Sequence, residues 1–473
     1  MKFITHFPRK AFLRVGVLLL SSLMANLPLL AQESGDGHHF TFEDILRRVV
    51  IASRSVKRAG LGVRSADLGR KREDSDFDFK YVPGGSIEID SSGRRRSELR
   101  FDLKKKLRSG IEISMGPSLG KSDGGGYRSE LTGSIEIPLL RGWGSEYNTH
   151  NLYLAGHEIR RRQRGQYDAV VENTLSALRF AYDIHQQDRL TEQYRQLIER
   201  LQRHVATARV REKAGLATQL DVYRAAIALK NAESRLLDIL ESARASQDEL
   251  RRVLFIDDRL PIRVTLPLGL PDISLSVEKA VEIGLANSVA LDQFRDDIKR
   301  AGRESKIARQ NTMPDLRMEI GYSHADKGVF SNGVDMDESI WRLQLSSSLD
   351  LARTRERLEY QARLIDEQDL GIRLEEERNK LANTIRNQWY GIKKSMDKVR
   401  LAEEQATQTR RKQTLSKLKF DHGKATNFDL IEAEIQLNQS LANALSERVG
   451  YLLGYYEFRA KLGTLVDLPV LRQ

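Results

Sequence analysis

Apolar and polar residues alternate in seven short segments of the chain. Five of them lie between residues 77 and 137, and two lie between residues 316 and 349. Alternation with a period of two is the pattern of a β-strand with two unlike faces. The segments are FDFKY (77–81), SIEID (86–90), ELRFDL (98–103), GIEISM (110–115), YRSELTGSIEI (127–137), LRMEIGY (316–322) and WRLQLSSSL (341–349).

Between these segments the pattern changes to that of long helices. None of the ten prolines falls in 139–260 or 315–468, and both windows are rich in Leu, Ala, Glu, Arg, Gln and Lys. Proline breaks helices and these residues favour them, so the sequence predicts helices over 41–72, 144–210 and 351–420. The last two would be rods of about 100 Å.

One of these predicted rods carries a seven-residue apolar repeat. Leu351, Leu358, Ile365 and Ile372 follow one another at this spacing, and after a slip Ile385, Ile392 and Val399 do so again. A repeat of seven with a phase shift is typical of a coiled coil.

The chain also repeats itself. GLATQLDV begins at Gly215, GKATNFDL begins at Gly423, and small and apolar positions stay in register for about 40 residues after each. The segments starting at Thr41 and Ser276 match more loosely. We therefore expect two structural repeats, 32–270 and 271–473, each with the order helix, strands, long helix, turn and returning helix.

The repeated octamer predicts the turn of a helical hairpin. Gly215 and Gly423 follow the long helices, where a left-handed residue ends a helix. A Thr-x-x-Asp spacing comes next, and it predicts a capping box that starts the returning helix. The capping pairs are Thr218 with Asp221, and Thr426 with Asp429.

The N-terminus adds a targeting signal. Residues 1–31 have a basic start and an apolar core, which predicts a cleaved signal peptide, with a membrane-anchor helix as the alternative. The chain has no cysteine, so it forms no disulfide and carries no lipid through a cysteine. No other segment is apolar enough for a spanning helix, so a membrane would be crossed by strands. The alternation fits an outer-membrane barrel but does not exclude a soluble sheet.

Charge and short motifs exclude other classes of protein. The net charge of +11 is spread among acidic residues, and no nucleic-acid-binding motif is present, so we expect no nucleic-acid partner. The G-x-S-x-G spelling at Ser118 is followed by a loop, where a nucleophile elbow needs a helix. The nine histidines show no metal-ligand spacing and look like ordinary surface residues, and GGG at 124–126 looks like a hairpin tip. We expect no catalytic residue, no metal and no cofactor, and therefore no enzyme.

Taken together, the duplicated order of elements resembles the TolC-like outer-membrane channel proteins, also called outer membrane efflux proteins. The resemblance runs from about Thr41 to Leu465, and its clearest carriers are GLATQLDVYRAAIAL, GKATNFDLIEAEIQL, IPLLRGWG and RAKLGTL. It implies a mainly α fold with long coiled-coil hairpins in an α-barrel tunnel. It also implies a homotrimer in which each chain gives four strands to a shared 12-stranded barrel.

The resemblance implies a function as well. Such a protein is a passive exit duct for efflux or type I secretion in the outer-membrane lipid, with its tunnel in the periplasm. A periplasmic adaptor, or membrane fusion protein, would open it, and an inner-membrane transporter would supply the energy. The alternative is a secreted periplasmic coiled-coil scaffold or chaperone without a pore.

Two features depart from the family pattern. The first half has five alternating segments where two long strands are implied, so either bulges split the strands or a hairpin is inserted. The run 92–110 is too charged for a lipid-facing span, and we expect it in a loop or above the membrane.

By resemblance, acidic residues on the returning helices would line the closed periplasmic aperture. The matching residues are Asp221, Asp429 and Glu432, with Arg224 standing where the second hairpin has Glu432. Asp429 and Glu432 share a helix face, so three chains would bring six carboxylates together. The alternative is that the aspartates only cap helices. The turns with Gly215, Thr218, Gly423 and Thr426 are the expected adaptor contacts.

Overall fold

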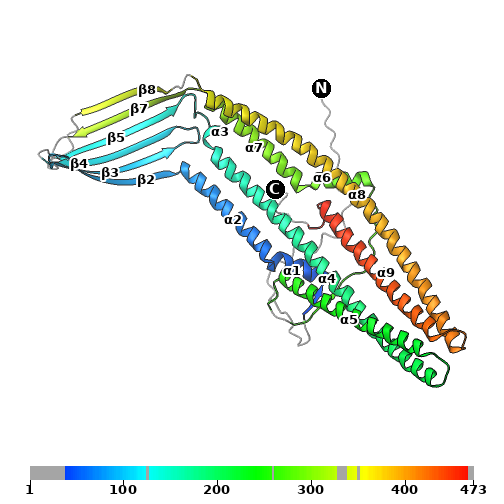
Figure 1. Cartoon of the computed structure of the whole chain (residues 1–473). Helices are drawn as coiled ribbons and strands as arrows, with labels where there is room; N and C mark the ends of the chain where they lie inside the picture. The colour runs from blue at the N-terminus through cyan, green and yellow to red at the C-terminus, as the bar shows by residue number, and fades with distance from the viewer. Residues whose placement is uncertain (1–37, 124–126, 258–259, 327–337, 349–351, 467–473) are drawn as a thin grey trace, which may run out of the picture.

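The computed structural model has two parts, a curved antiparallel sheet and a long assembly of helices that continues from one end of it (Figure 1). It describes residues 38–123, 127–257, 260–326, 338–348 and 352–466. The predicted signal peptide and the GGG tip therefore lie outside the described residues.

The sheet has six strands in the order β2-β3-β4-β5-β7-β8, and each strand is antiparallel to its neighbours. The strands are β2 (Phe79–Ile89), β3 (Arg95–Lys106), β4 (Glu112–Ser122), β5 (Tyr127–Pro138), β7 (Asp315–Asp326) and β8 (Glu338–Ser348). The predicted segments all contribute to this sheet. The resemblance implies that each chain gives four strands to the barrel, whereas the sheet of the single chain has six, because the first half alone supplies four.

The first two predicted segments belong to one strand. β2 runs through Pro83, Gly84 and Gly85, which had separated the segments in the sequence. Among the described residues β2 pairs on one side only, and an edge strand tolerates a proline because one row of its N–H groups needs no partner in the ladder. The first half therefore forms two hairpins, β2–β3 and β4–β5, and of the two explanations the inserted hairpin is the correct one.

The expectation of a loop for the charged run 92–110 is also wrong, because most of it is β3. Alternation places Arg96, Arg100 and Lys104 on one face of this strand, and Leu99, Phe101 and Leu103 on the other. The number of charges in the whole run does not show that they are concentrated on one face of the strand.

The same two faces run across all six strands. Cross-strand pairs join Leu99 to Leu119, Ile135 to Ile320, and Ile320 to Leu343 on one side, which we call the apolar face. On the other side, the polar face, Glu136 pairs with Glu319, and Ser114 with Ser134. The apolar face is uncovered in the single chain: Leu99 is 66% exposed and Leu343 is 72% exposed.

The helices follow the predicted plan with one interruption. The predicted helix 41–72 is two helices, α1 (Phe42–Ala52) and α2 (Arg54–Asp74), because Ser53 takes an extended conformation (φ −56°, ψ 127°). The 3₁₀ turn η1 (Ser75–Phe77) and the short α3 (Ser145–Asn148) connect helices to strands. The remaining helices are α4 (His150–Lys213), α5 (Gln219–Leu254), α6 (Val277–Asn287), α7 (Val289–Asn311), α8 (Thr354–Asp421) and α9 (Asn427–Lys461).

These helices form one layer that is four helices wide. Next to the sheet the order of neighbours is α2, α4, α7 and α8, and farther away it is α5, α4, α9 and α8 (Figure 1). The helices α4 and α8, of 64 and 68 residues, run through both zones and are each about 100 Å long.

The largest core lies halfway along the helical layer. It includes Tyr182, Leu254, Ile385 and Phe458, which come from both halves of the chain. Strand β1 (His38–Thr41) pairs in parallel with β6 (Ile262–Thr265) beside this core. The order of elements occurs twice along the chain, but the halves are joined by a common core. The boundaries 32–270 and 271–473 stay a prediction.

Candidate functional site

The end of the helical layer away from the sheet is made by two nearly identical turns. Gly215 has φ +71° and Gly423 has φ +69°, the left-handed conformation predicted for both. The next residue closes each turn, since Leu216 N–H donates to the Arg211 carbonyl and Lys424 N–H to the Lys419 carbonyl, both at 2.8 Å. Glycine adopts this conformation without steric cost, so both helices end at the same sequence signal.

Both predicted capping boxes are confirmed. The Thr218 N–H donates to Asp221 Oδ2 at 3.0 Å, and the Asp221 N–H donates back to Thr218 Oγ1 at 3.3 Å. In the second turn the corresponding distances, between Thr426 and Asp429, are 2.8 and 3.2 Å. Hydrogen bonds from the threonine backbone and hydroxyl lower the pKa of Asp221 and of Asp429, so both carboxylates are charged at neutral pH.

The other proposed aperture residues are exposed beside these caps. Glu432 accepts a hydrogen bond from Gln436 Nε2 at 2.9 Å and lies on the solvent side of α9 with Asp429. Arg224 is 4.0 Å from Asp221 and its guanidinium lies over the Phe428 ring, 4.9 Å from its centroid. In the single chain Arg224 thus contacts the second hairpin through an aromatic ring and not through Glu432.

A buried ionic cluster joins the two hairpins one turn away, and the sequence analysis missed it. Glu434 on α9 is 5% exposed and its Oε2 lies 3.2 Å from Arg200 Nε and 3.5 Å from His204 Nε2, both on α4. Asn427 exchanges hydrogen bonds with the His204 side chain and backbone. Burial by itself would raise the pKa of Glu434, but His204 and Arg200 outweigh it and the pKa is lowered. The sequence contains a sign of this burial, because helical spacing places Glu434 on the same side of α9 as Leu430 and Ile431.

A second cluster joins α4 to α7 nearer the sheet. Asp296 accepts from Arg160 at 2.9 Å and from Arg164 at 2.7 Å, and His157 Nε2 lies 3.0 Å from Asp297. His157 and His324 are buried, so the view of the histidines as surface residues is wrong for both. Among the described residues, no group of His, Asp and Glu is arranged to hold a metal ion.

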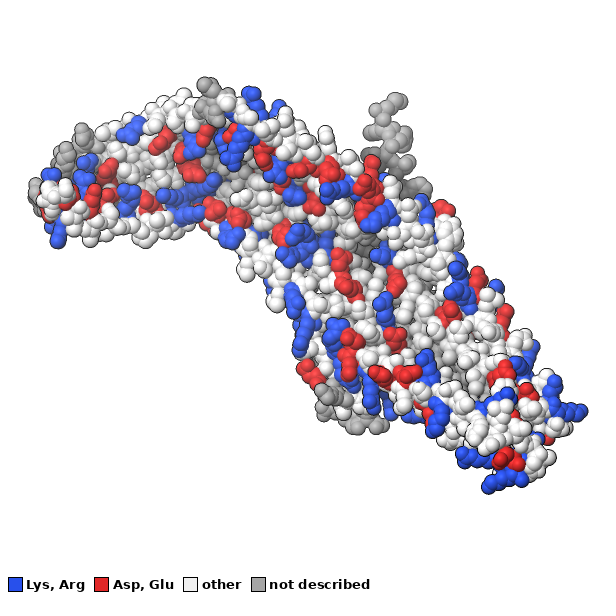
Figure 2. Space-filling view, in the orientation of Figure 1, with Lys and Arg blue, Asp and Glu red and all other residues white. Residues whose placement is uncertain are grey.

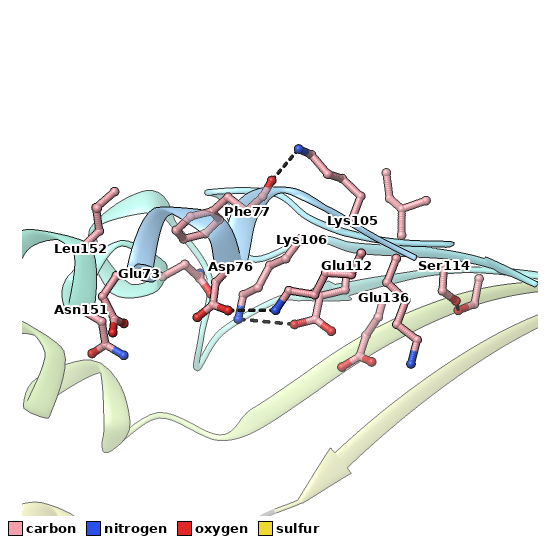
Figure 3. Close-up of a pocket in the computed structure, with 15 residues that line it drawn as sticks. Glu73, Asp76, Phe77, Lys105, Lys106, Glu112, Ser114, Glu136, Asn151 and Leu152 are labelled. Carbon is pink, nitrogen blue, oxygen red and sulfur yellow. Dashed lines mark hydrogen bonds and ion pairs between the residues drawn. The ribbon is translucent and has the colours of Figure 1, made fainter. Parts of the chain in front are cut away.

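Where the sheet meets the helices, the polar face forms a hollow of about 500 Å³ (Figure 3). Lys80 donates to Asp76 at 2.8 Å and Lys106 lies 3.4 Å from Glu112, while Glu73 and Asn151 border the hollow from α2 and α4. These charges are paired along an open surface, so the hollow offers no isolated charge for a ligand at these pairs. Ser118 lies inside β4 on the same face, with strands on both sides of it.

The face of the molecule drawn in Figure 2 shows no large patch of one charge sign. Basic and acidic side chains are intermingled along the helices in Figure 2. Many of the ion pairs join residues three or four apart on one helix, such as Arg162 with Glu158 and Arg373 with Asp369. Within the described part of the chain, no helix has the length and apolar character needed to cross a membrane.

Comparison with known proteins finds this architecture in solved structures only. No family model and no curated protein matches the sequence. Solved structures do: CusC, described as forming a transmembrane channel, has 12% identity over 89% of this chain and 92% of its own, with a TM-score of 0.67. The CmeC outer-membrane channel of Campylobacter jejuni has 9% identity, 90% and 86% coverage, and a TM-score of 0.68.

A third structure agrees with these two. The MtrE outer-membrane channel of Neisseria gonorrhoeae, in its open state, has 13% identity, 90% and 89% coverage, and a TM-score of 0.67. At such low identity the likeness concerns the path of the backbone. The fold of this chain is therefore that of the TolC-like outer-membrane channels.

Proposed function

We propose that three copies of this chain form an outer-membrane exit duct of an efflux or type I secretion system. The strands cross the outer membrane and the helices continue into the periplasm as a tunnel. The signal peptide is removed on export and no lipid anchor is added. The duct is passive and has no enzymatic activity.

One observation carries this proposal: a sheet with one uncovered apolar face continues directly into helices of about 100 Å. Its strands of 11 and 12 residues are long enough to span a bilayer when tilted. Lipid would cover the apolar face, and the charged polar face would line water. In the alternative, a secreted scaffold, the apolar face of six strands would stay in contact with water.

The two edges of the layer support association between copies. On α2, Leu61 and Leu68 are seven residues apart and 62% and 66% exposed. On α8, Leu358, Ile365 and Ile372 form a stripe with the same spacing and are 59 to 64% exposed. Here α2 and α8 stand at opposite edges, so α8 of one copy can pack its stripe against α2 of the next.

The turns at the far end are the proposed site of contact with other proteins. A periplasmic adaptor would bind the exposed turns at Gly215, Thr218, Gly423 and Thr426, and an inner-membrane transporter would supply the energy. In the closed state, Asp429 and Glu432 of three copies would meet at the aperture, with Asp221 and Arg224 beside them. Six carboxylates at a constriction favour cations.

The aperture role has its own test. The double variant Asp429→Ala/Glu432→Ala is expected to lose cation selectivity in a planar bilayer. Thr426→Ala is the control, because it removes a cap and leaves both carboxylates. Unchanged selectivity in the double variant would leave the aspartates as helix caps only.

The function as a whole is tested by cell fractionation and by light scattering on the detergent-extracted mature protein. A trimer in the outer-membrane fraction is the expected result. A soluble periplasmic monomer or dimer would overturn the duct and favour the scaffold.

A further inference from the structure

We propose that the β2–β3 hairpin is a full part of the barrel wall, so that three copies close a barrel of 18 strands. This inference rests on the proposed function, because it assumes the trimeric duct. It concerns the calibre of the duct at the membrane, and hence the size of cargo that can leave.

The sheet is continuous through the β2–β3 hairpin. β2 is paired with β3 over its whole length, from Phe79↔Lys105 to Ile89↔Arg95. β3 is paired in turn with β4, from Arg96↔Ser122 to Lys106↔Glu112. The six strands have 11 or 12 residues each, so the hairpin is as tall as the rest of the wall.

The hairpin has the same two faces as the other strands. Tyr81, Leu99, Phe101 and Leu103 extend the apolar face, and the basic residues on that face, Arg95 and Lys105, stand at strand ends. The polar face carries Arg96, Glu98, Arg100, Asp102 and Lys104. A hairpin folded into the pore would place the apolar residues in water, whereas in the wall they face lipid.

The two edge strands of the sheet run in opposite directions. Strands alternate in direction across the sheet, so β8, at one edge, runs opposite to β2, at the other. Over the described residues, β2 pairs only with β3 and β8 only with β7. The β8 edge of one copy can therefore continue as an antiparallel ladder on the β2 edge of the next, which leaves no free edge in lipid.

The sheet and the helical layer also have similar widths. Four helices at about 9 Å spacing cover an arc of about 36 Å. Six strands about 4.8 Å apart and tilted by about 40° cover about 38 Å, whereas four would cover about 25 Å. Because α2 leads into β2 and β8 leads towards α8, the edges of the sheet and of the helical layer fall on the same sides (Figure 1). Six strands match the width of the helices below them.

A barrel of 18 such strands has a backbone radius of about 18 Å, against about 12 Å for 12 strands. The area enclosed by the backbone rises about twofold. The wall at the membrane is then about as wide as a tunnel of twelve helices. The membrane segment would admit any cargo that the open tunnel admits, including bulky solutes and polypeptides.

The absence of cysteine from the chain makes a direct test possible. Ser86 on β2, Ser118 on β4 and Gln344 on β8 lie on the polar face in the middle of their strands. One variant carries Ser86→Cys with Gln344→Cys, and the other carries Ser118→Cys with Gln344→Cys. Each is repeated with cysteine at Arg342 or Ser346 in place of Gln344, to allow for the register between copies.

The two variants separate the two barrels. With 18 strands, β2 neighbours β8 of the next copy, so the Ser86 variant is expected to give oxidised, covalently linked trimers. The Ser118 variant is the matched control, because three strand spacings, about 14 Å, are too far for a disulfide. Links within a chain are excluded by the same spacing, three strands for Ser118 and five for Ser86.

Other outcomes overturn the inference in distinguishable ways. Links in the Ser118 variant alone would mean that the hairpin lies outside the wall, with the duct itself intact. Trimers by light scattering without links in either variant would also reject the β2–β8 contact. A soluble monomer without links would mean that the proposed function has failed.

Discussion

The two long hairpins, α4–α5 and α8–α9, have the same turn but different surroundings. In both, a left-handed glycine is followed by a capping box with nearly equal distances. Yet buried residues occur along α4 from His157 to Ala208, whereas on α8 they occur only from Ala382 to Ala406. The turn is therefore set by local sequence, and the burial of each helix by its place in the layer.

The two halves of α8 show the same difference within one helix. One set of apolar residues on α8 is buried in the chain's own core: Ile385, Ile392 and Val399. The other set has the same seven-residue spacing but is exposed to solvent: Leu358, Ile365 and Ile372. Leu351, the first residue of the repeat, lies outside the described residues. An apolar stripe left uncovered on an edge helix indicates a partner, which we take to be the next copy.

The largest expected effect comes from placing charge in the uncovered stripe. Ile365→Asp/Ile372→Asp should abolish the trimer, because two buried isoleucines contribute about 3 to 6 kcal/mol per interface and a buried unpaired charge adds a penalty. Light scattering in detergent measures the loss. Ile365→Leu/Ile372→Leu is the control and should stay trimeric; a trimeric aspartate variant would show that the stripe faces something else.

The next effect separates the buried and exposed acids of the second hairpin. Glu434→Ala should lower the free energy of unfolding by about 1 to 3 kcal/mol, since Arg200 and His204 lose their partner and Arg200 is only partly screened by solvent. Glu432→Ala, two residues away and exposed, should change it by no more than about 0.5 kcal/mol. Denaturant unfolding followed by circular dichroism gives both values, and equal losses would contradict the cluster's role.

The same cluster predicts a pH dependence. The pKa of Glu434 is lowered in the folded chain, so its contribution to stability is complete above its ordinary value of 4.5 and is lost as the pH falls below that value. Thermal unfolding between pH 7 and pH 3 should show a smaller loss of stability for Glu434→Gln than for the unaltered chain. Parallel curves would mean that the glutamate makes no net ionic contribution.

The smallest effects test the equivalence of the two turns. Thr218→Ala and Thr426→Ala should each cost about 1 kcal/mol, because each removes a side-chain cap from a helix start. Amide hydrogen exchange in the first turns of α5 and α9 would report the two losses separately, with Thr→Ser as the control at each site. A clear inequality would show that the surroundings, and not the octamer, set the strength of the turn.

Features that depend on neighbours in the sequence could be predicted. The caps, the left-handed glycines and the long rods follow from short-range geometry, and each is found where the pattern placed it. One local prediction is wrong: the alternation pattern separates residues 77–81 from 86–90 because Pro83 lies between them, yet both contribute to β2. A proline interrupts a strand only where its N–H would be needed for pairing.

Features that depend on distant partners could not be predicted in the same way. Glu434 finds Arg200 and His204 more than two hundred residues away along the chain, and spacing alone does not reveal such a pair. The β2–β3 hairpin was misjudged for another reason. Its charges were counted over the run, although Arg96, Arg100 and Lys104 share one face and leave the other apolar.

The parallel pairing of β1 with β6 sets the order in which the chain can fold. The two helical hairpins join neighbouring segments and can form early, since local contacts close small loops. His38 must instead wait for Ile262, its partner in the ladder, which emerges from synthesis more than two hundred residues later. The start of the described chain is thus expected to be among the last parts to acquire its native contacts, and it stays accessible to export and chaperone machinery until then.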